Sequence, residues 1–143
     1  MSTFQDNFIN ILKTNGLSIT RQRQLLFDLL QDQDPLSMNE LTELVGTTID
    51  RASVYRIIAT FEETGIVRRI SIGWKFKIEL SEAFVAHHHH LTCLSCQLVV
   101  PINQEKLESF ISELADINNF QPIQHQVEIQ GYCQRCQANR NIA

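Results

Sequence analysis

Apolar side chains recur every three to four positions through the first 64 residues, in four short blocks separated by glycine or polar stretches. This period places the apolar side chains of each block on one side of an α-helix. We therefore predict four short amphipathic helices. Their apolar positions are Phe4, Phe8, Ile11 and Leu12; Leu25, Leu26, Leu29 and Leu30; Leu41, Leu44 and Val45; and Val54, Ile57, Ile58 and Phe61.

Polar residues that favour helix N-termini stand before three of these blocks. Thr20 and Asp50 are suited to cap the second and fourth helices, because their side-chain oxygens can accept hydrogen bonds from the first free backbone N–H groups. Ser37 and Glu40 have the spacing of a capping box before the third helix. Gly16, at the end of the first block, is a plausible helix stop.

The apolar period changes from 3.6 to 2 after Gly65. Residues 66–72 and 75–80 alternate as two strands joined at Gly73 and Trp74. Helices followed by a hairpin predict a winged helix-turn-helix domain over residues 1–80. In that fold the helix after the turn enters the major groove of DNA and the hairpin touches the adjacent backbone.

The helix predicted over residues 50–64 is the candidate recognition helix. Its first turns carry Arg51, Ser53, Tyr55 and Arg56, which offer guanidinium and hydroxyl groups to phosphates and base edges. The alternative is that these long side chains only cover the surface of the domain.

The rest of the chain predicts a second, smaller α/β unit over residues 87–143, after a hinge at 81–86. Residues 98–102 indicate a strand that Pro101 confines to a sheet edge, 104–118 a helix, and Val127 and Ile129 a strand that ends near Gly131. The predicted fold class is therefore α+β. A unit of about 55 residues is marginal alone, so we expect a metal and a partner subunit to stabilise it.

Length and charge narrow the classes of function. A composition of 43% hydrophobic and 20% charged residues is typical of a globular protein. A chain of 143 residues is too short for a large barrel enzyme. The net charge is −4, yet residues 47–78 hold six Lys or Arg against three acidic residues. This segment favours a local anion-binding surface, although an ordinary solvated face would have the same charge pattern.

The chain has neither a membrane-length apolar run nor a signal peptide. We therefore expect a cytoplasmic protein without a membrane partner.

All the cysteines fall in two Cys-x-x-Cys pairs separated by 36 residues. One such pair alone could be a thioredoxin-like redox site. Two pairs without a spare thiol favour a tetrahedral thiolate site for Zn²⁺. The predicted ligands are Cys93, Cys96, Cys133 and Cys136.

Four consecutive histidines, His87 to His90, precede the first cysteine pair. If this segment is extended, His87 and His89 point to one face and His88 and His90 to the other. One strand could then serve two metal sites, with imidazole ligands that suit Zn, Fe or Mn ions and with carboxylates such as Glu79 or Glu108 completing them.

These features together resemble the ferric uptake regulator family. The resemblance runs over nearly the whole chain in order. It is carried by Thr20-x-x-Arg23, Ser53-Val-Tyr-Arg56, Gly65-Ile-Val67, His88-x-His90-Leu-x-Cys93-x-x-Cys96, His125 and Gly131-Tyr-Cys-x-x-Cys136.

The resemblance implies a homodimeric repressor with an N-terminal winged helix and a C-terminal dimerisation domain that holds structural zinc. It implies a regulatory divalent metal, Fe²⁺, Zn²⁺ or Mn²⁺, at the hinge on Glu79, His88 and His90. A further family site corresponds to His87, His89, Glu108 and His125, where His89 replaces the usual Asp. Thr20 and Arg23 join the recognition helix as expected contacts to a double-stranded, AT-rich palindromic operator.

Other classes of function compete with this interpretation. A zinc hydrolase or deaminase could use the histidine cluster, but the chain lacks both His-Glu-x-x-His and the His-x-Glu with Pro-Cys-x-x-Cys signature. We therefore expect no enzyme. A metal-storage or adaptor protein is the remaining alternative, and the basic winged helix argues against it.

Overall fold

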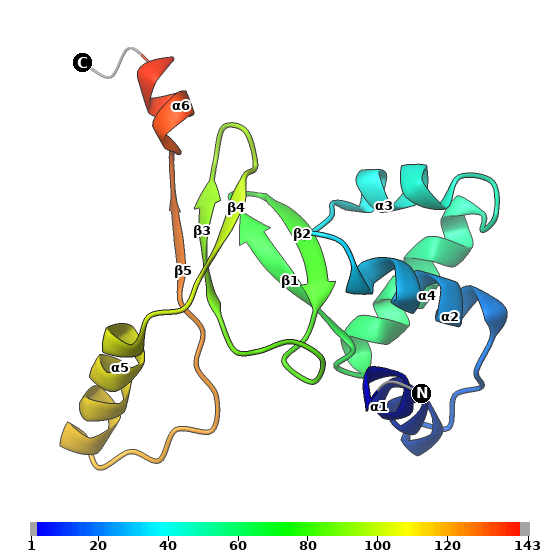
Figure 1. The fold of residues 1–143 in the computed structure, drawn as a ribbon, viewed down its shortest axis with the longest axis horizontal. Helices are drawn as coiled ribbons and strands as arrows, with labels where there is room; N and C mark the ends of the chain where they lie inside the picture. Colours follow the sequence, from blue (N-terminus) through cyan, green and yellow to red (C-terminus); the bar gives the residue numbers. More distant parts are fainter. Residues whose placement is uncertain (1–2, 141–143) are drawn as a thin grey trace. The chain divides into compact units, whose positions relative to one another are not determined.

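The computed structural model describes residues 3–140, which form two compact units that divide between Ala86 and His87 (Figure 1). We describe each unit by itself. Within residues 3–140, no helix is both long and apolar enough to cross a membrane.

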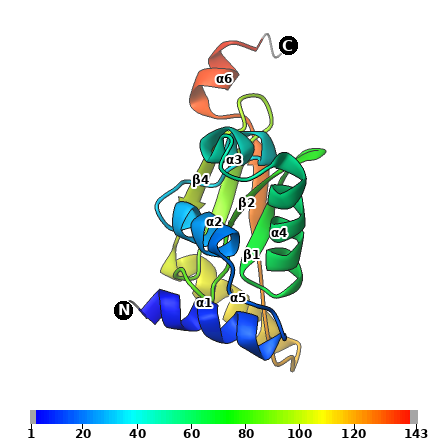
Figure 2. The same ribbon diagram turned by 90° about the vertical axis from the view of Figure 1, so that its right-hand side faces the viewer.

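The first unit consists of four helices followed by a two-stranded antiparallel hairpin, as the apolar pattern predicted. Helix α4 leads into the hairpin and contacts it through β1 (Figure 2). The elements are α1 Thr3–Thr14, α2 Arg21–Gln31, α3 Met38–Val45, α4 Arg51–Glu63, β1 Val67–Ile72 and β2 Lys75–Leu80.

The helices begin where the capping residues predicted. The Thr20 hydroxyl accepts a hydrogen bond from the backbone N–H of Arg23, at 3.2 Å. Ser37 and Glu40 form both hydrogen bonds of the capping box. Asp50 caps α4 by accepting from the backbone N–H of Ser53 at 2.9 Å.

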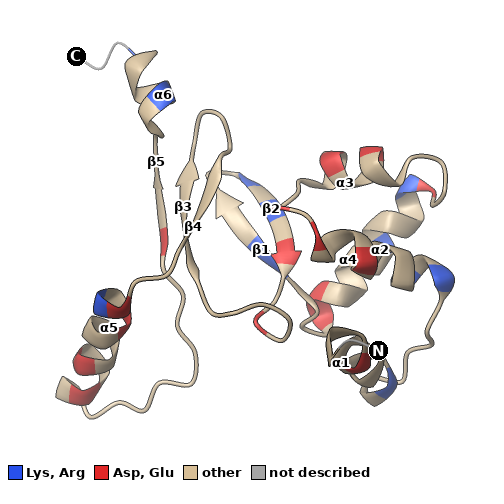
Figure 3. Ribbon diagram, viewed as in Figure 1, with Lys and Arg blue, Asp and Glu red and all other residues tan. Residues whose placement is uncertain are grey.

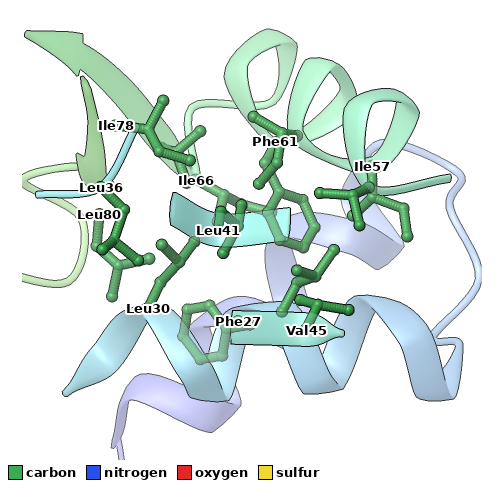
Figure 4. Packing of buried hydrophobic residues seen from close by; sticks show 14 of the residues in the cluster. Phe27, Leu30, Leu36, Leu41, Val45, Ile57, Phe61, Ile66, Ile78 and Leu80 are labelled. Atoms are coloured by element: carbon green, nitrogen blue, oxygen red, sulfur yellow. The ribbon is translucent and has the colours of Figure 1, made fainter. Parts of the chain in front are cut away.

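The hydrophobic core lies between the helices and the inner face of the hairpin. Phe8 stacks on Phe27 with ring centroids 4.1 Å apart, and it meets Phe61 edge to face at 5.7 Å. Figure 4 shows side chains from α2, α3, α4 and the hairpin converging on this cluster. The core therefore fixes the position of α4 relative to the hairpin.

The segment after the hairpin packs onto the same unit. Phe84 is buried and its ring lies 5.0 Å from that of Phe27. The Ser81 hydroxyl donates to the Gly65 carbonyl, and the Asn7 side chain donates to the Ala83 carbonyl. The first unit thus has its own continuous core as far as residue 86.

The second unit is a three-stranded mixed sheet with strand order β4-β3-β5. The central strand β3 pairs antiparallel with β4 and parallel with β5, and Pro101 lies on the edge strand β4, as predicted. A short final helix, α6, was not predicted. The elements are β3 His89–Cys93, β4 Val99–Ile102, α5 Glu105–Ile117, β5 Glu128–Gly131 and α6 Gln134–Ala138.

The second unit buries few apolar side chains of its own. In its described part, the only buried hydrophobic residues are Cys93 and Cys136, and α5 buries none. Large side chains stay exposed on α5, on the loop after it and on the sheet: Phe110, Leu114, Ile117, Phe120, Ile123, Val100 and Ile129. Because water contact with so much apolar surface is unfavourable, this unit is suited to pack against a partner.

Candidate metal centres and nucleic-acid interface

The four cysteines converge at one end of the sheet in the second unit. Cys93 ends β3, Cys96 lies in the turn that follows, and Cys133 and Cys136 lie at the start of α6 and within it. The parallel pairing of β3 with β5 places Cys93 opposite Gly131, which brings the two cysteine pairs together across the sheet. All four sulfur atoms lie within 4.8 Å of one another.

The sulfur geometry fits a tetrahedral ion. Tetrahedral Zn²⁺ with Zn–S bonds of 2.3 Å requires sulfur atoms about 3.8 Å apart. The Sγ atoms of Cys96 and Cys133 are 3.7 Å apart. None of the four cysteines forms a disulfide, so all four thiols are available as ligands.

The surroundings of the thiols favour thiolate at two of them. Burial would raise the pKa of the Cys93 thiol, but backbone N–H groups of Cys96, Cys133 and Ser95 outweigh it and lower this pKa to about 6. The backbone N–H of Leu98 lowers the pKa of Cys96. These N–H groups would also stabilise the charge of a metal-bound thiolate.

Cys136 behaves differently from the other pair of thiols. A hydrogen bond with Ser95 favours its thiolate, but hydrogen bonding with Cys133 and burial prevail and raise the pKa of Cys136 to about 11. A bound cation would reverse this balance, because it stabilises a thiolate directly. A hydrogen bond with Cys96 and the charge of its thiolate raise the pKa of Arg135.

A second ligand cluster lies on one face of β3, where His87, His89, Glu108 and His125 meet. The Nε2 atoms of His87 and His125 are 2.9 Å apart, and those of His87 and His89 are 3.3 Å apart. Glu108, from α5, accepts from His89 at 2.6 Å and from His125 at 2.7 Å. Burial would raise the pKa of Glu108, but these two hydrogen bonds lower it below its usual value.

The proton on His89 has a defined place in this cluster. The backbone N–H of Val127 donates to Nδ1 of His89 at 3.0 Å, so a neutral ring carries its proton on Nε2 and donates it to Glu108. A metal on Nε2 must displace that proton. His89 is therefore a poorer ligand, in this arrangement, than a histidine whose Nδ1–H faces an acceptor.

The other two histidines lie together on the opposite face. The rings of His88 and His90 have centroids 4.7 Å apart, and Nδ1 of His90 is 3.9 Å from a carboxylate oxygen of Glu128. The alternation predicted for this segment is therefore observed.

The third predicted ligand of the regulatory site, Glu79, belongs to the first unit. There it lies opposite Arg68 in the hairpin and accepts from its guanidinium at 2.7 and 2.8 Å. A regulatory site shared by Glu79, His88 and His90 stays a prediction.

The exposed face of α4 carries a connected set of polar side chains. One guanidinium nitrogen of Arg51 donates to the Asn39 side chain at 3.1 Å and to the Tyr55 hydroxyl at 3.3 Å. Tyr55 is 41% exposed. Figure 3 shows basic positions on this helix and on the hairpin. Asn39 was not among the predicted site residues, because its position in the sequence gives no sign of the contact across helices.

Ser53, which is also predicted to contact DNA, makes its hydrogen bonds within the first turns of α4. It is buried, its hydroxyl donates to Asp50 at 2.6 Å, and it accepts from the Arg56 guanidinium at 2.9 Å. The hydrogen bonds from Ser53 hold the pKa of Asp50 below its usual value. Asp50 and Ser53 thus hold the Arg56 side chain in place.

Thr20 and Arg23 are both engaged at the start of α2. Thr20 caps that helix, and the Arg23 guanidinium donates to the Ser18 carbonyl at 2.6 Å. Thr20 is exposed and Arg23 is partly buried, so both keep some surface that a partner can reach.

Comparison with known proteins identifies the family. The model of the "Ferric uptake regulator family" matches residues 14–130. Ferric uptake regulation proteins of Vibrio anguillarum and Yersinia pestis are 34% and 32% identical to the chain, covering 91% and 86% of each sequence respectively.

Solved structures agree with this match. The Vibrio cholerae ferric uptake regulator has a TM-score of 0.74 at 32% identity, over 85% of this chain and 96% of that one. The Helicobacter pylori regulator has a TM-score of 0.81 at 23% identity, over 95% of both chains, and supports the fold. The chain therefore belongs to the ferric uptake regulator family, whose members are metal-responsive, DNA-binding transcription regulators and not enzymes.

Proposed function

We propose that the protein is a cytoplasmic homodimeric repressor that binds an AT-rich palindromic operator when a regulatory metal is bound. The observation that carries this proposal is the arrangement around β3. Its N-terminal end and the residues before it present two histidine pairs on opposite faces, and its C-terminal end leads into the four-cysteine cluster. One strand can therefore connect a structural metal site to a regulatory metal site.

The four cysteines are proposed to hold structural Zn²⁺. The 3.7 Å separation of two sulfur atoms and the N–H groups directed at Cys93 support this assignment. Bound Zn²⁺ would fix α6 to the end of β3, in a unit that has little apolar core of its own. It would thereby hold the second unit in a form able to dimerise.

Glu79, His88 and His90 are proposed to hold the regulatory ion between the winged helix and the dimerisation domain, around the hinge predicted at residues 81–86. A nitrogen and oxygen ligand set of this kind suits Fe²⁺, Zn²⁺ or Mn²⁺. Glu79 would have to exchange its hydrogen bonds with Arg68 for the ion. If only the DNA-competent arrangement lets all three ligands reach the ion, metal binding favours that arrangement.

The cluster of His87, His89, Glu108 and His125 is proposed as an additional metal site within the second unit. Its ligand atoms lie within 4.8 Å of one another and come from β3, from α5 and from the segments next to β3 and β5. An ion there would tie α5 to the sheet. Because protons compete with a metal ion for imidazole and carboxylate ligands, we expect this site to bind metal less tightly as the pH falls.

The exposed residues of the first unit are proposed to contact the operator. Tyr55, with Arg51 or Arg56, would read base edges from the first turns of α4, and Thr20 and Arg23 would meet the backbone. Ser53 would act by holding Arg56. A second copy of the chain would supply the second half-site contact, packed through the apolar surface of the dimerisation domain.

A selection experiment tests the proposed function as a whole. Duplexes selected by the protein from a random pool should share a palindromic, AT-rich sequence. Anisotropy titrations of a selected duplex with Fe²⁺, Mn²⁺ or Zn²⁺ should show binding that requires metal beyond one structural zinc per chain. Equal binding with and without added metal would contradict a regulatory ion.

Substitutions in α4 test the proposed recognition surface. We expect Arg56→Ala and Tyr55→Phe each to weaken operator binding by roughly 5- to 100-fold, which corresponds to about 1–3 kcal/mol for a specific contact. If Arg56 meets a phosphate, the slope of log K against log salt should fall by about 1; if it meets a guanine, discrimination between bases should fall instead.

An exposed residue of the same helix provides the control for these variants. Glu63→Ala, at the opposite end of α4, should retain operator affinity and bound zinc. Wild-type affinity in both Arg56→Ala and Tyr55→Phe would place the recognition surface elsewhere.

A further inference from the structure

The tip of the hairpin carries the one tryptophan of the chain in an exposed position. The last pair of the β-ladder is Ile72 with Lys75, so the connecting loop consists of Gly73 and Trp74. Gly73 has a φ of +62° and Trp74 does not have a positive φ, a pattern typical of a type II′ turn. Trp74 is 90% exposed. A large aromatic ring thus lies at the outermost point of the unit's hairpin.

The tip lies at the end of the unit where α4 begins. The 13 residues of α4 span about 20 Å, and the six residues of β1 also span about 20 Å. The chain reverses at Gly65, and β1 and α4 diverge from there, so that the turn of the hairpin and the first turns of the helix lie toward the same end of the unit (Figures 1 and 2). The tip and the exposed Tyr55 can therefore both contact one extended partner molecule.

The hairpin is held rigidly against the rest of the unit. Ile70 and Ile72 are buried on its inner face. Arg69 lies over the Phe76 ring, 3.9 Å from the centroid, and bonds to Glu62 of α4 at 2.8 Å. The exposure of Trp74 is thus a property of a fixed structure, and little conformational entropy would be lost on binding.

The charges around Trp74 indicate the chemistry of its partner. Three of the four cations in the hairpin pair with carboxylates: Arg68 with Glu79, Arg69 with Glu62 and Lys77 with Glu40. The fourth, Lys75, lies 5.0 Å from the Trp74 ring centroid and pairs with no carboxylate in the described part of the chain. The tip therefore presents a flat aromatic ring beside the Lys75 ammonium group. Along a DNA strand, an apolar deoxyribose face likewise alternates with a charged phosphate.

We propose that Trp74 packs against the deoxyribose face of the DNA backbone bordering the half-site, while Lys75 binds an adjacent phosphate. This inference rests on DNA binding by the family, but not on which residues of α4 read the bases. The hairpin tip thereby adds an apolar contact to binding that is otherwise polar and electrostatic. Its contribution should hardly depend on salt.

Affinity measurements at several salt concentrations separate the two parts of the tip. Trp74→Ala should weaken binding to a selected duplex by roughly tenfold, as expected for an aromatic anchor, with an unchanged slope against salt, because an apolar contact releases no counterions. Lys75→Ala should lower that slope by about 1. Trp74→Phe is the matched control and should restore most of the affinity. Equal thermal melting of all three variants would show that the fold is unchanged.

The tryptophan also reports directly on its own environment. Its emission should shift to shorter wavelength when the wild-type protein is saturated with DNA, because the ring leaves water. Unchanged emission at saturation, or wild-type affinity in Trp74→Ala, would overturn the proposal. A shift that follows protein concentration without DNA would also overturn it, by assigning the ring to a contact between protein chains.

The comparison with Arg56→Ala keeps this inference separate from the proposed recognition surface. Loss of affinity in Trp74→Ala with none in Arg56→Ala would retain the role of the hairpin tip and reject that of α4. The opposite result would retain α4 and reject the hairpin tip.

Discussion

Replacing Cys136 by Ser should unfold the second unit, release its zinc and abolish dimerisation. Binding of Zn²⁺ to a structural site contributes folding free energy directly, on the order of 10 kcal/mol. The second unit depends on this contribution, since in its described part no hydrophobic residue other than Cys93 and Cys136 is buried. Cys93→Ser should have the same effect, while the first unit, with its own core, should stay folded.

Metal analysis, sedimentation and thermal melting measure this prediction together. The matched control is Gln134→Ser, which changes an exposed position of the same short helix and should keep one zinc per chain and the dimer. A Cys136→Ser protein that retains both zinc and the dimer would remove the four-cysteine site from this account.

Changes on the two faces of the histidine segment should have different consequences for DNA binding. His88→Ala and Glu79→Gln should lose metal-activated DNA binding while remaining dimeric, because they would remove ligands of the regulatory ion. A coupling of about 1–3 kcal/mol corresponds to a loss of roughly 5- to 150-fold in affinity. Glutamine is chosen at position 79 because its amide oxygen can still accept from Arg68, which leaves the hairpin intact.

Variants of the opposite face provide the comparison. His87→Ala and His125→Ala should mainly lower the stability of the second unit, with a smaller loss of DNA binding, because their cluster joins α5 to the sheet within that unit. Metal titrations by anisotropy and thermal melting distinguish the two outcomes. If His87→Ala loses the metal response and His88→Ala keeps it, the two sites must exchange roles.

Local features of the sequence were sufficient for the elements of the first unit. Thr20, Ser37 and Asp50 determine where helices begin, because capping involves backbone groups only two or three residues away. The change of apolar period after Gly65 determined the hairpin for a similar reason, since alternation along a strand is a local property. The same alternation placed His87 and His89 on one face of their strand and His88 and His90 on the other.

Relations between distant residues were decided only by the tertiary structure. The spacing of the cysteines predicted a four-thiol site, but the parallel pairing of β3 with β5 is what brings Cys93 to Cys133. The Val127 N–H that fixes the proton of His89 likewise comes from 38 positions away. Hydrogen bonds of this kind depend on how strands and helices pack, and no local pattern of residues records that packing.

Ser53 shows that tertiary packing also decides contacts between residues that are close in the sequence. Its place in the first turn of α4 predicted a hydroxyl available to DNA, because no local pattern of residues indicates its burial. Packing of α4 places Ser53 inward, where it bonds to Asp50 and Arg56. The residue types and their spacing thus determined which chemistry the protein carries. Burial and long-range pairing, which depend on the whole chain, decided which side chains are placed to perform it.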